Sequence, residues 1–210
     1  MRAETMVPVK HIIFDLGNVL VNIHPERTMQ ALAASCGKDI SEIRNFFLSQ
    51  AHLKFMKGVL SPQEFHREFS ENFECRISFT EFIAIWNDLI GNAKEGIAEI
   101  VEQLYRRFTL SVCSNTDPVH WEIARRTSPF LNKFQQYFLS FEMKCLKPDA
   151  VIFRRMLASL AVPASQCIFV DDTEENILQA NRIGLRTIHA QNSQTIRAGL
   201  SEVGINIISE

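Results

Sequence analysis

The sequence has 210 residues, of which 46% are hydrophobic, and its formal net charge is -2 at pH 7. That length and apolar content are sufficient for the core of one domain plus an insertion of moderate size. Positive and negative charges are spread along the whole chain, so neither a nucleic acid nor a membrane is an expected partner.

The first predicted strand is HIIFD, residues 11–15. The residues before it include no apolar stretch long enough for a signal peptide, and no later run approaches the roughly 20 residues that span a bilayer. A cytoplasmic location is therefore expected. Asp15 lies at the carboxyl end of this strand, followed by a turn at Leu16-Gly17-Asn18. Taken alone, such an aspartate is more simply a turn-stabilising residue.

Residues 22–92 show helical patterns without a convincing strand, which predicts an inserted helical cap. Ser61 to Glu64 indicates a capping box with proline at the first helical position, and Asp39 to Glu42 and Ser78 to Glu81 have the same spacing. Half of the 16 phenylalanines fall in this segment, which is enough apolar area for a small bundle. We expect two short hinges, near residues 21–25 and 90–95, to join the cap to a core made of residues 1–21 and 93–210.

The rest of the chain alternates between strand and helix patterns. Predicted strands are residues 108–115, 137–142, 166–172 and 186–190, and predicted helices are 95–107, 118–127, 149–160 and 174–183. This alternation favours right-handed crossovers and a three-layer α/β/α, Rossmann-like core with a parallel sheet. In such sheets ligands bind outside the carboxyl ends of the strands, where the polar endings of these runs gather.

Three polar clusters follow predicted strands in this part of the chain. Ser114-Asn115-Thr116 offers a hydroxyl and backbone N–H groups suited to phosphate oxygens. Lys147-Pro148 offers a cation between a strand and a helix, and Asp171-Asp172 offers the carboxylates that Mg²⁺ requires. Each has a plainer interpretation: a turn, a surface lysine, and the cap of the next helix.

Cysteine and histidine positions give no sign of a disulfide framework or a zinc site. The five cysteines are an odd number at irregular spacings, so buried reduced thiols are expected at Cys36, Cys75, Cys113, Cys145 and Cys167. The six histidines show no metal-binding spacing. A metal ion in this protein is therefore expected to have oxygen ligands.

The four polar clusters together resemble the motifs of the haloacid dehalogenase-like (HAD) superfamily of aspartyl-nucleophile phosphohydrolases. The resemblance covers nearly all of the chain, and its insertion corresponds to the helical, C1-type cap of that superfamily. Within it, GVLSPQEF and SNTDxxH, which ends at His120, are similar to a bacterial subgroup that includes an α-glucose-1-phosphate phosphatase. The stretches that carry the resemblance are FDLGNVL (14–20), SVCSNTD (111–117), LKPDAVIF (146–153) and FVDDTEENILQANRIGL (169–185).

The resemblance implies Mg²⁺-dependent hydrolysis of a small phosphorylated metabolite through an aspartyl-phosphate. An anionic nucleophile can approach a phosphoryl group only if a divalent cation and a lysine offset the repulsion, and hydrolysis of the intermediate then completes two easier steps. The implied catalytic residues are Asp15 as nucleophile and Lys147 as the charge-neutralising base. The implied phosphate ligands are Ser114, Asn115, Asn18 and Lys147, and the implied metal ligands are Asp15, the carbonyl of Gly17, Asp172 and, directly or through water, Asp171.

One position departs from the pattern of the superfamily. Most of its phosphatases carry a second aspartate two residues after the nucleophile, as general acid and base, where this chain has Gly17. Such a group contributes roughly 10²- to 10⁴-fold. Three accounts are open: a slow enzyme; an acid supplied by Asn18, His24 or Glu142; or a substrate that needs little acid help. We favour the last, because the anomeric oxygen of a sugar 1-phosphate is a weakly basic leaving group.

Two other functions compete with this interpretation. A 2-haloacid dehalogenase would use the same nucleophile without a metal, which Asp171-Asp172 argues against, and a phosphometabolite-binding protein with weakened catalysis is supported by Gly17. The cap residues Arg27, Trp86 and His24 are candidates for substrate contact, although Arg27 is equally a surface residue and Trp86 a core aromatic. The oligomeric state expected is a monomer or weak homodimer.

Overall fold

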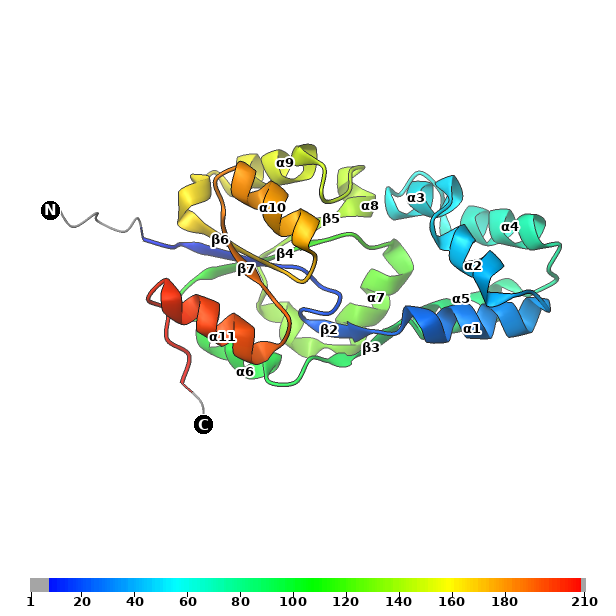
Figure 1. Ribbon diagram of the computed structural model, residues 1–210, viewed down its shortest axis with the longest axis horizontal. Coiled ribbons are helices and arrows are strands. Elements are labelled where there is room, and N and C mark those ends of the chain that lie inside the picture. Colours follow the sequence, from blue (N-terminus) through cyan, green and yellow to red (C-terminus); the bar gives the residue numbers. More distant parts are fainter. Residues whose placement is uncertain (1–7, 209–210) are drawn as a thin grey trace, which may run out of the picture.

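Five parallel strands form the central sheet of the protein, whose structure is a computed structural model that describes residues 8–208 (Figure 1). They are β1 His11–Phe14, β4 Thr109–Ser114, β5 Gln136–Leu139, β6 Cys167–Asp171 and β7 Arg186–His189. The order across the sheet is β5-β4-β1-β6-β7, and every neighbouring pair is parallel. The central strand β1 therefore has β4 on one side and β6 on the other.

Helices cover both faces of this sheet, which confirms the three-layer fold. One face is covered by α6 Ile97–Leu104, α7 Pro118–Thr127 and α11 Ser193–Glu202, and the other by α9 Ala150–Leu160 and α10 Glu174–Arg182. Short 3₁₀ helices span Pro129–Lys133 and Ala164–Gln166. The three inner strands β4, β1 and β6 are buried on both faces, which is why they are mainly apolar runs rather than alternating patterns. Among residues 8–208, no helix has both the length and the apolar character needed to cross a bilayer.

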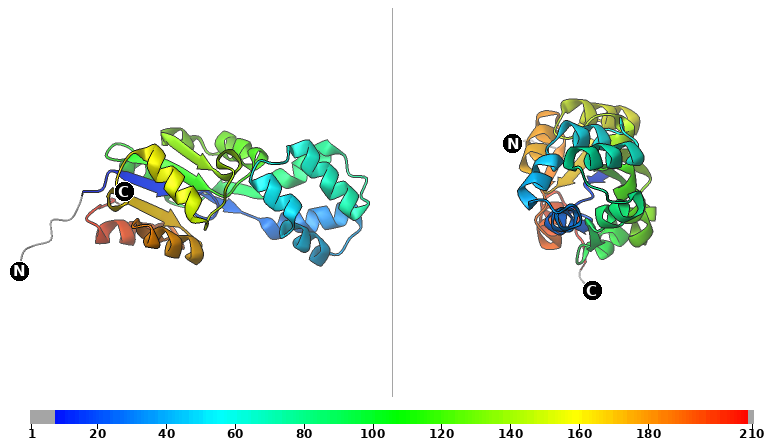
Figure 2. Two further views of the ribbon diagram at one scale, coloured as in Figure 1. Left: turned by 90° about the horizontal axis from the view of Figure 1, so that it is seen from above. Right: turned by 90° about the vertical axis from the view of Figure 1, so that its right-hand side faces the viewer.

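A separate helical lobe lies between β2 and β3 in the chain and continues the long axis of the molecule (Figure 2). Its helices are α1 Pro25–Cys36, α2 Ile40–Phe47, α3 Gln50–Met56, α4 Pro62–Phe73 and α5 Phe79–Asn87. Phenylalanines and Trp86, which is fully buried, dominate a core that belongs to the lobe itself. The predicted helix starts are seen: complete capping boxes begin α2 at Asp39 and α4 at Ser61, and the Ser78 hydroxyl accepts the N–H of Glu81 at the start of α5.

The two connections of the lobe to the core are strands, which the sequence did not predict. Strand β2, Val21–Ile23, pairs antiparallel with β3, Ile90–Ala93. Each strand is only three or four residues long, and its partner lies about 70 positions away in the chain, so no local periodicity reveals the pairing. The lobe is thus attached through a two-stranded ribbon.

The strand predicted at residues 137–142 is correct in its first half and wrong in its second. Strand β5 ends at Leu139, and Ser140–Met143 forms a short helix, α8. The fully buried Ser140 hydroxyl accepts the N–H of Thr116 at 2.9 Å and donates to the carbonyl of Met56 at 2.7 Å. These long-range bonds stop the extended strand and connect β4, α8 and the lobe.

The prediction of five reduced cysteines is wrong for one pair. Cys36, at the end of α1, and Cys75, just after α4, form a disulfide with Cα atoms 5.2 Å apart. Cys113, Cys145 and Cys167 are free and buried, as expected. The paired cysteines are 39 positions apart, and only the folding of the lobe brings them together.

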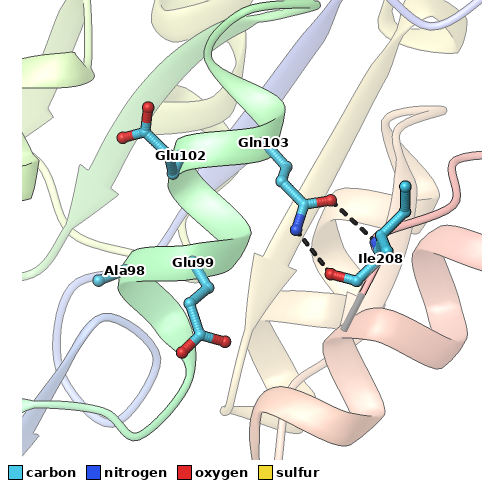
Figure 3. Close-up of a pocket in the computed structure, with 5 residues that line it drawn as sticks. All are labelled: Ala98, Glu99, Glu102, Gln103 and Ile208. Atoms are coloured by element: carbon cyan, nitrogen blue, oxygen red, sulfur yellow. Dashed lines mark hydrogen bonds between the residues drawn. The ribbon is translucent and has the colours of Figure 1, made fainter. Parts of the chain in front are cut away.

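The carboxyl-terminal segment is tied to α6 at the end of the molecule far from the lobe (Figure 1). Figure 3 shows the side-chain amide of Gln103 donating to the carbonyl of Ile208 at 2.7 Å and accepting its N–H at 2.9 Å. A hollow of about 320 Å³ lies here, and it contains none of the predicted site residues. Its carboxylates Glu99 and Glu102 are already paired with cations of neighbouring elements.

Candidate active site

Three predicted site residues lie at the ends of three adjacent strands. In the sheet, Phe14 is in register with Val112 of β4 and Val170 of β6, so Asp15 directly follows the paired segment. Ser114 ends β4 and Asp171 ends β6. Because β1 lies between these two strands, Asp15 has Ser114 on one side and Asp171 on the other.

Lys147 joins two of the carboxylates of the site. Its Nζ atom is 2.8 Å from Oδ1 of Asp15 and 2.6 Å from Oδ2 of Asp171, and the residue is only 4% exposed. Burial by itself disfavours the ammonium ion, but the two carboxylates outweigh burial and raise the pKa of Lys147. The lysine is therefore a permanent cation at the centre of the site.

Asp15 has one oxygen held and one available. Oδ1 accepts the N–H of Leu16 at 2.7 Å in addition to the lysine, whereas Oδ2 has no hydrogen-bond partner within residues 8–208. Burial and the nearby Asp171 raise the pKa of Asp15 to about 6, against the opposing effect of Lys147. A further cation beside Oδ2 would favour the ionised carboxylate.

The donor atoms of the site suit a hard divalent cation. One oxygen from each of Asp15, Asp171 and Asp172 lies within 4.8 Å of the others, while two oxygens on opposite sides of Mg²⁺ would be about 4 Å apart. Asp171 is held by the N–H of Thr173 and the amide of Asn176, both 2.9 Å from its Oδ1. Asp172 is half-buried, which leaves it accessible to an ion.

The carbonyl of Gly17 could complete this set of oxygen ligands. The bridge between Gly17 and Val21 consists of the bond from the N–H of Val21 to the Leu16 carbonyl, 3.0 Å, and the bond from the N–H of Asn18 to the Val21 carbonyl, 2.7 Å. The carbonyl of Gly17 takes no part in either bond. Asn18 adopts a left-handed conformation with φ 56°, which shapes this turn next to Asp15.

The other two phosphate-ligand candidates differ in what their side chains do. Ser114 is 3% exposed and lines a cavity beside Asp15. The amide of Asn115 is committed to the backbone of Lys147: it accepts the N–H and donates to the carbonyl, both at 2.8 Å. Asn115 therefore positions the lysine, and the Lys147-Pro148 peptide bond that follows is cis.

A cavity of about 170 Å³ lies between core and lobe, lined by the two residues that follow Asp15 in the chain but not by the three aspartates themselves. Gly17 lines it, at the position where many relatives of the predicted superfamily carry their acid. A Cβ atom at Gly17 would be 3.3 Å from the side chain of Ile23, so the space is close-packed on that side. The lining residues are Leu16, Gly17, Ile23, Phe47, His52, Met56, Leu89, Ile90, Ser114, Asn115, Thr116 and His120.

Comparison with known proteins identifies the family. Residues 9–184 match the model of the haloacid dehalogenase-like hydrolases. The chain belongs to this family. The resemblance inferred from the four polar clusters is thereby confirmed.

Relatives of this HAD-like hydrolase include characterised phosphatases. The chain is 23% identical over 202 residues to a D-ribitol-5-phosphate phosphatase of Bacteroides thetaiotaomicron, covering 93% of this chain and 98% of that protein. It is 22% identical over 206 residues to flavin mononucleotide hydrolase 1 of Arabidopsis thaliana, covering 93% and 78%. A HAD family enzyme of B. thetaiotaomicron, crystallised with magnesium and inorganic phosphate, has a TM-score of 0.78 and 25% identity, covering 85% and 92%.

Sequence reasoning missed the lobe residues that reach the cavity of this HAD-like hydrolase. Phe47, His52 and Met56 line it from α2 and α3. None belongs to a motif, and only the docking of the lobe brings them to the strand ends. The sequence also gives no sign that the amide of Asn176 supports Asp171.

The other cap and acid candidates lie elsewhere. His24 and Arg27 line a different groove, where Arg27 pairs with Asp88 at 2.8 Å. Glu142 is exposed on α8. Trp86 is fully buried in the lobe core, so its interpretation as a core aromatic is correct.

Trp86 instead takes part in a buried link between the lobe and α7. Its indole N–H donates to Oδ2 of Asp117 at 3.1 Å, and its carbonyl is 2.8 Å from Nε2 of His120. The Nδ1 atom of His120 is 2.7 Å from the same Asp117 oxygen. Because both partners of the imidazole are acceptors, both of its nitrogens carry hydrogen, and the ring is an imidazolium facing a buried carboxylate.

Proposed function

We propose that this protein is a Mg²⁺-dependent phosphatase that hydrolyses a small phosphorylated metabolite through an aspartyl-phosphate on Asp15. Its family and its phosphatase relatives support hydrolysis of a phosphoric monoester as the class of reaction. The metal dependence and the intermediate are proposals that rest on the geometry of the site.

The observation that carries this proposal is the charge arrangement around Asp15. A buried lysine neutralises one side of the carboxylate, and two further carboxylates lie within reach of a shared ion. Without added positive charge, a phosphate dianion would meet three carboxylates and one ammonium ion, which is a repulsive site. The arrangement therefore suits an anionic substrate only when a cation is bound.

In this proposal each residue of the site has its own role. Oδ2 of Asp15, the oxygen without a partner, attacks phosphorus. Bound at Asp15, Asp171, Asp172 and the Gly17 carbonyl, Mg²⁺ would neutralise phosphoryl charge as a Lewis acid. The phosphoryl oxygens are held by Lys147 and the Ser114 hydroxyl, together with Asn18 and the backbone of Asn115. The apolar cavity limits the access of bulk water.

The test is a screen of many phosphate esters in magnesium or chelator, run beside Asp15→Asn. We expect hydrolysis by the wild-type protein in magnesium, and none in chelator or with the variant. Halide release from 2-haloacids that persists in chelator would instead support the dehalogenase. Tight ligand binding without turnover across the panel would support the weakened binding protein. Either result contradicts the phosphatase proposal.

We further propose a sugar 1-phosphate as the substrate, because Gly17 cannot protonate the leaving group. The polar side chains of the cavity are few, so a sugar can bury only part of its hydroxyl groups there. Rates for matched sugar 1-phosphates, sugar 6-phosphates and phenyl phosphate at saturating magnesium test this choice. Faster cleavage of the 6-phosphate contradicts the proposal. A preference for phenyl phosphate would support the need for a weakly basic leaving group but would contradict a sugar as the substrate.

The domain division is a proposal of the same kind. We propose that the cap, residues 22–92, moves as a unit on the β2–β3 ribbon relative to the core of residues 1–21 and 93–210. Limited proteolysis with and without phosphate and magnesium would test this division, since closure protects the ribbon. The cytoplasmic location and the monomer or weak homodimer stay predictions.

A further inference from the structure

One histidine of the helical lobe reaches the cavity at the strand ends. His52 lies on α3, and it lines the cavity together with Gly17 and Ser114 of the core. Helix α3 is the lobe helix next to α8 (Figure 1), where the carbonyl of Met56, one turn after His52, accepts the Ser140 hydroxyl. This bond connects the end of α3 to the start of α8.

The orientation of the His52 ring is set by its own helix pair. Nδ1 lies 2.7 Å from the carbonyl of Phe47. A carbonyl only accepts hydrogen bonds, so Nδ1 carries the hydrogen and, in the neutral ring, Nε2 carries the lone pair. No residue between 8 and 208 hydrogen-bonds Nε2. Since His52 lines the cavity, a water molecule or ligand there is the candidate partner of this lone pair.

The surroundings of His52 favour its neutral form. The rings of Phe47, Phe65 and Trp86 lie within 6.0 Å of its centroid. Burial lowers the pKa of His52 below 6.5 against the opposing effect of its bond to the Phe47 carbonyl, and the charges of Asp117 and His120, at the start of α7, act in opposite directions. A half-buried, neutral imidazole whose Nε2 lone pair has no hydrogen-bond partner among residues 8–208 can accept a proton.

We infer that His52 is the general base that activates water for hydrolysis of the aspartyl-phosphate, a role that rests on the proposed function and that Gly17 cannot perform. In the first step Oδ2 of Asp15 bonds to phosphorus, the ester P–O bond breaks, and the leaving oxygen takes a proton from bulk water. In the second step water attacks phosphorus, its proton passes to Nε2 of His52, and the bond to Asp15 breaks with its electron pair returning to the carboxylate. His52 then releases the proton to bulk water, so one ester and one water give one alcohol and one phosphate.

The test separates the two steps with p-nitrophenyl phosphate in magnesium. In His52→Gln we expect a burst of p-nitrophenol, a fall of kcat of roughly 10²- to 10⁴-fold, and accumulation of phosphoenzyme seen by intact-mass spectrometry. The wild-type kcat should rise with pH through a value below 6.5, and the variant should lack that rise. Added imidazole should restore turnover in His52→Ala.

The matched control is His66→Gln, because the ring of His66 also bonds a backbone carbonyl, that of Ile77 at 2.9 Å, but lies on α4 away from the cavity. It should retain the wild-type kcat and show no burst. If His52→Gln slows the first turnover and the steady state equally, without phosphoenzyme, His52 is not the base. If the wild-type protein forms no Asp15-dependent phosphoenzyme at all, the proposed function itself fails, and the two failures are thus distinguished.

Discussion

At the scale of single residues, the site depends most on Lys147. Its ammonium group is the only cation in contact with either Asp15 or Asp171 among residues 8–208, and all three residues are at least nine-tenths buried. Removing one member of a buried charge network leaves the others uncompensated, at a cost of about 3–5 kcal/mol. The lysine therefore supports both the stability of the strand ends and the charge balance of the site.

We expect Lys147→Met to lower the free energy of unfolding by about 3–5 kcal/mol and to abolish phosphatase activity. Urea unfolding and a phosphatase assay in saturating magnesium measure the two effects. The matched control is Lys144→Met, since Lys144 is exposed and donates only to the carbonyl of Gly58. Equal stability of the two variants would mean that Lys147 does not compensate the buried carboxylates.

At the scale of elements, the contact between α5 and α7 contains a titratable pair. The pKa of Asp117 is lowered: burial opposes ionisation, but His120 and the hydrogen bonds from neighbouring groups outweigh it. A carboxylate with a depressed pKa contributes stability that is complete well above the unfolded value of about 3.9 and is lost as pH falls through the lower folded value. The lobe is thus held on the core more weakly in acid.

We expect Asp117→Asn to cost about 3–5 kcal/mol of unfolding free energy at neutral pH, because it leaves the His120 imidazolium without its buried counter-ion. The difference from wild type should shrink progressively below about pH 5, because the aspartate of the unfolded chain takes up a proton first, and it should vanish once pH falls through the lowered pKa of folded Asp117. Trp86→Phe, which keeps an aromatic ring but loses one hydrogen bond to the carboxylate, should cost less, roughly 1.5–3 kcal/mol. A difference that does not change with pH in chemical unfolding would contradict the ionised pair.

The disulfide between α1 and the end of α4 is a second contact between elements that stabilises the lobe. Closing a loop of 39 residues stabilises the folded state by about 4 kcal/mol in the chain-entropy description. We expect the double variant Cys36→Ser, Cys75→Ser to lose about that much and to be insensitive to reductant, unlike the wild-type protein. Thiol titration of denatured, unreduced protein should find the three free cysteines and, after reduction, all five. Five thiols without reduction would contradict the bridge.

The elements that the sequence predicts correctly carry local signals. The start of α4 is encoded in Ser61-Pro62-Gln63-Glu64. Strand β1 is a short apolar run followed by Asp15, and β6 is one that ends in Asp171. The elements that it misses depend on distant partners. Strand β2 exists because β3 returns beside it, and the Cys36–Cys75 bridge exists because α1 and α4 pack together. Helix α11, Ser193–Glu202, was not predicted although Asn192 caps it.

At the scale of the whole molecule, the sequence predicts the residues at the strand ends but not the lobe residues that line the cavity above them. Asp15, Ser114, Lys147 and Asp171 could be placed together because carboxyl ends of parallel strands share one edge of a sheet. The residues that line the cavity from the other side, such as His52, come from the lobe. Its docking on the core depends on side-chain packing and on hydrogen bonds of side chains, such as those of His120 to the Trp86 carbonyl and of Ser140 to the Met56 carbonyl. Such contacts leave no motif. Because these lobe residues would contact the substrate, the identity of the substrate is what the sequence predicts least well.

Magnesium should stabilise the entire fold, because the acidic cluster joins the ends of β1 and β6. Saturation at about 100 times the dissociation constant contributes about 2.7 kcal/mol, which for a chain of this size raises the melting temperature by about 5–10 °C. Thermal unfolding in magnesium and in chelator measures this shift without any assay of activity. Asp172→Asn should abolish the shift and, by removing one of the clustered like charges, raise the melting temperature in chelator. Glu142→Gln removes an exposed carboxylate outside the cluster and should keep the full shift. If Asp172→Asn keeps the full shift as well, the ion binds elsewhere.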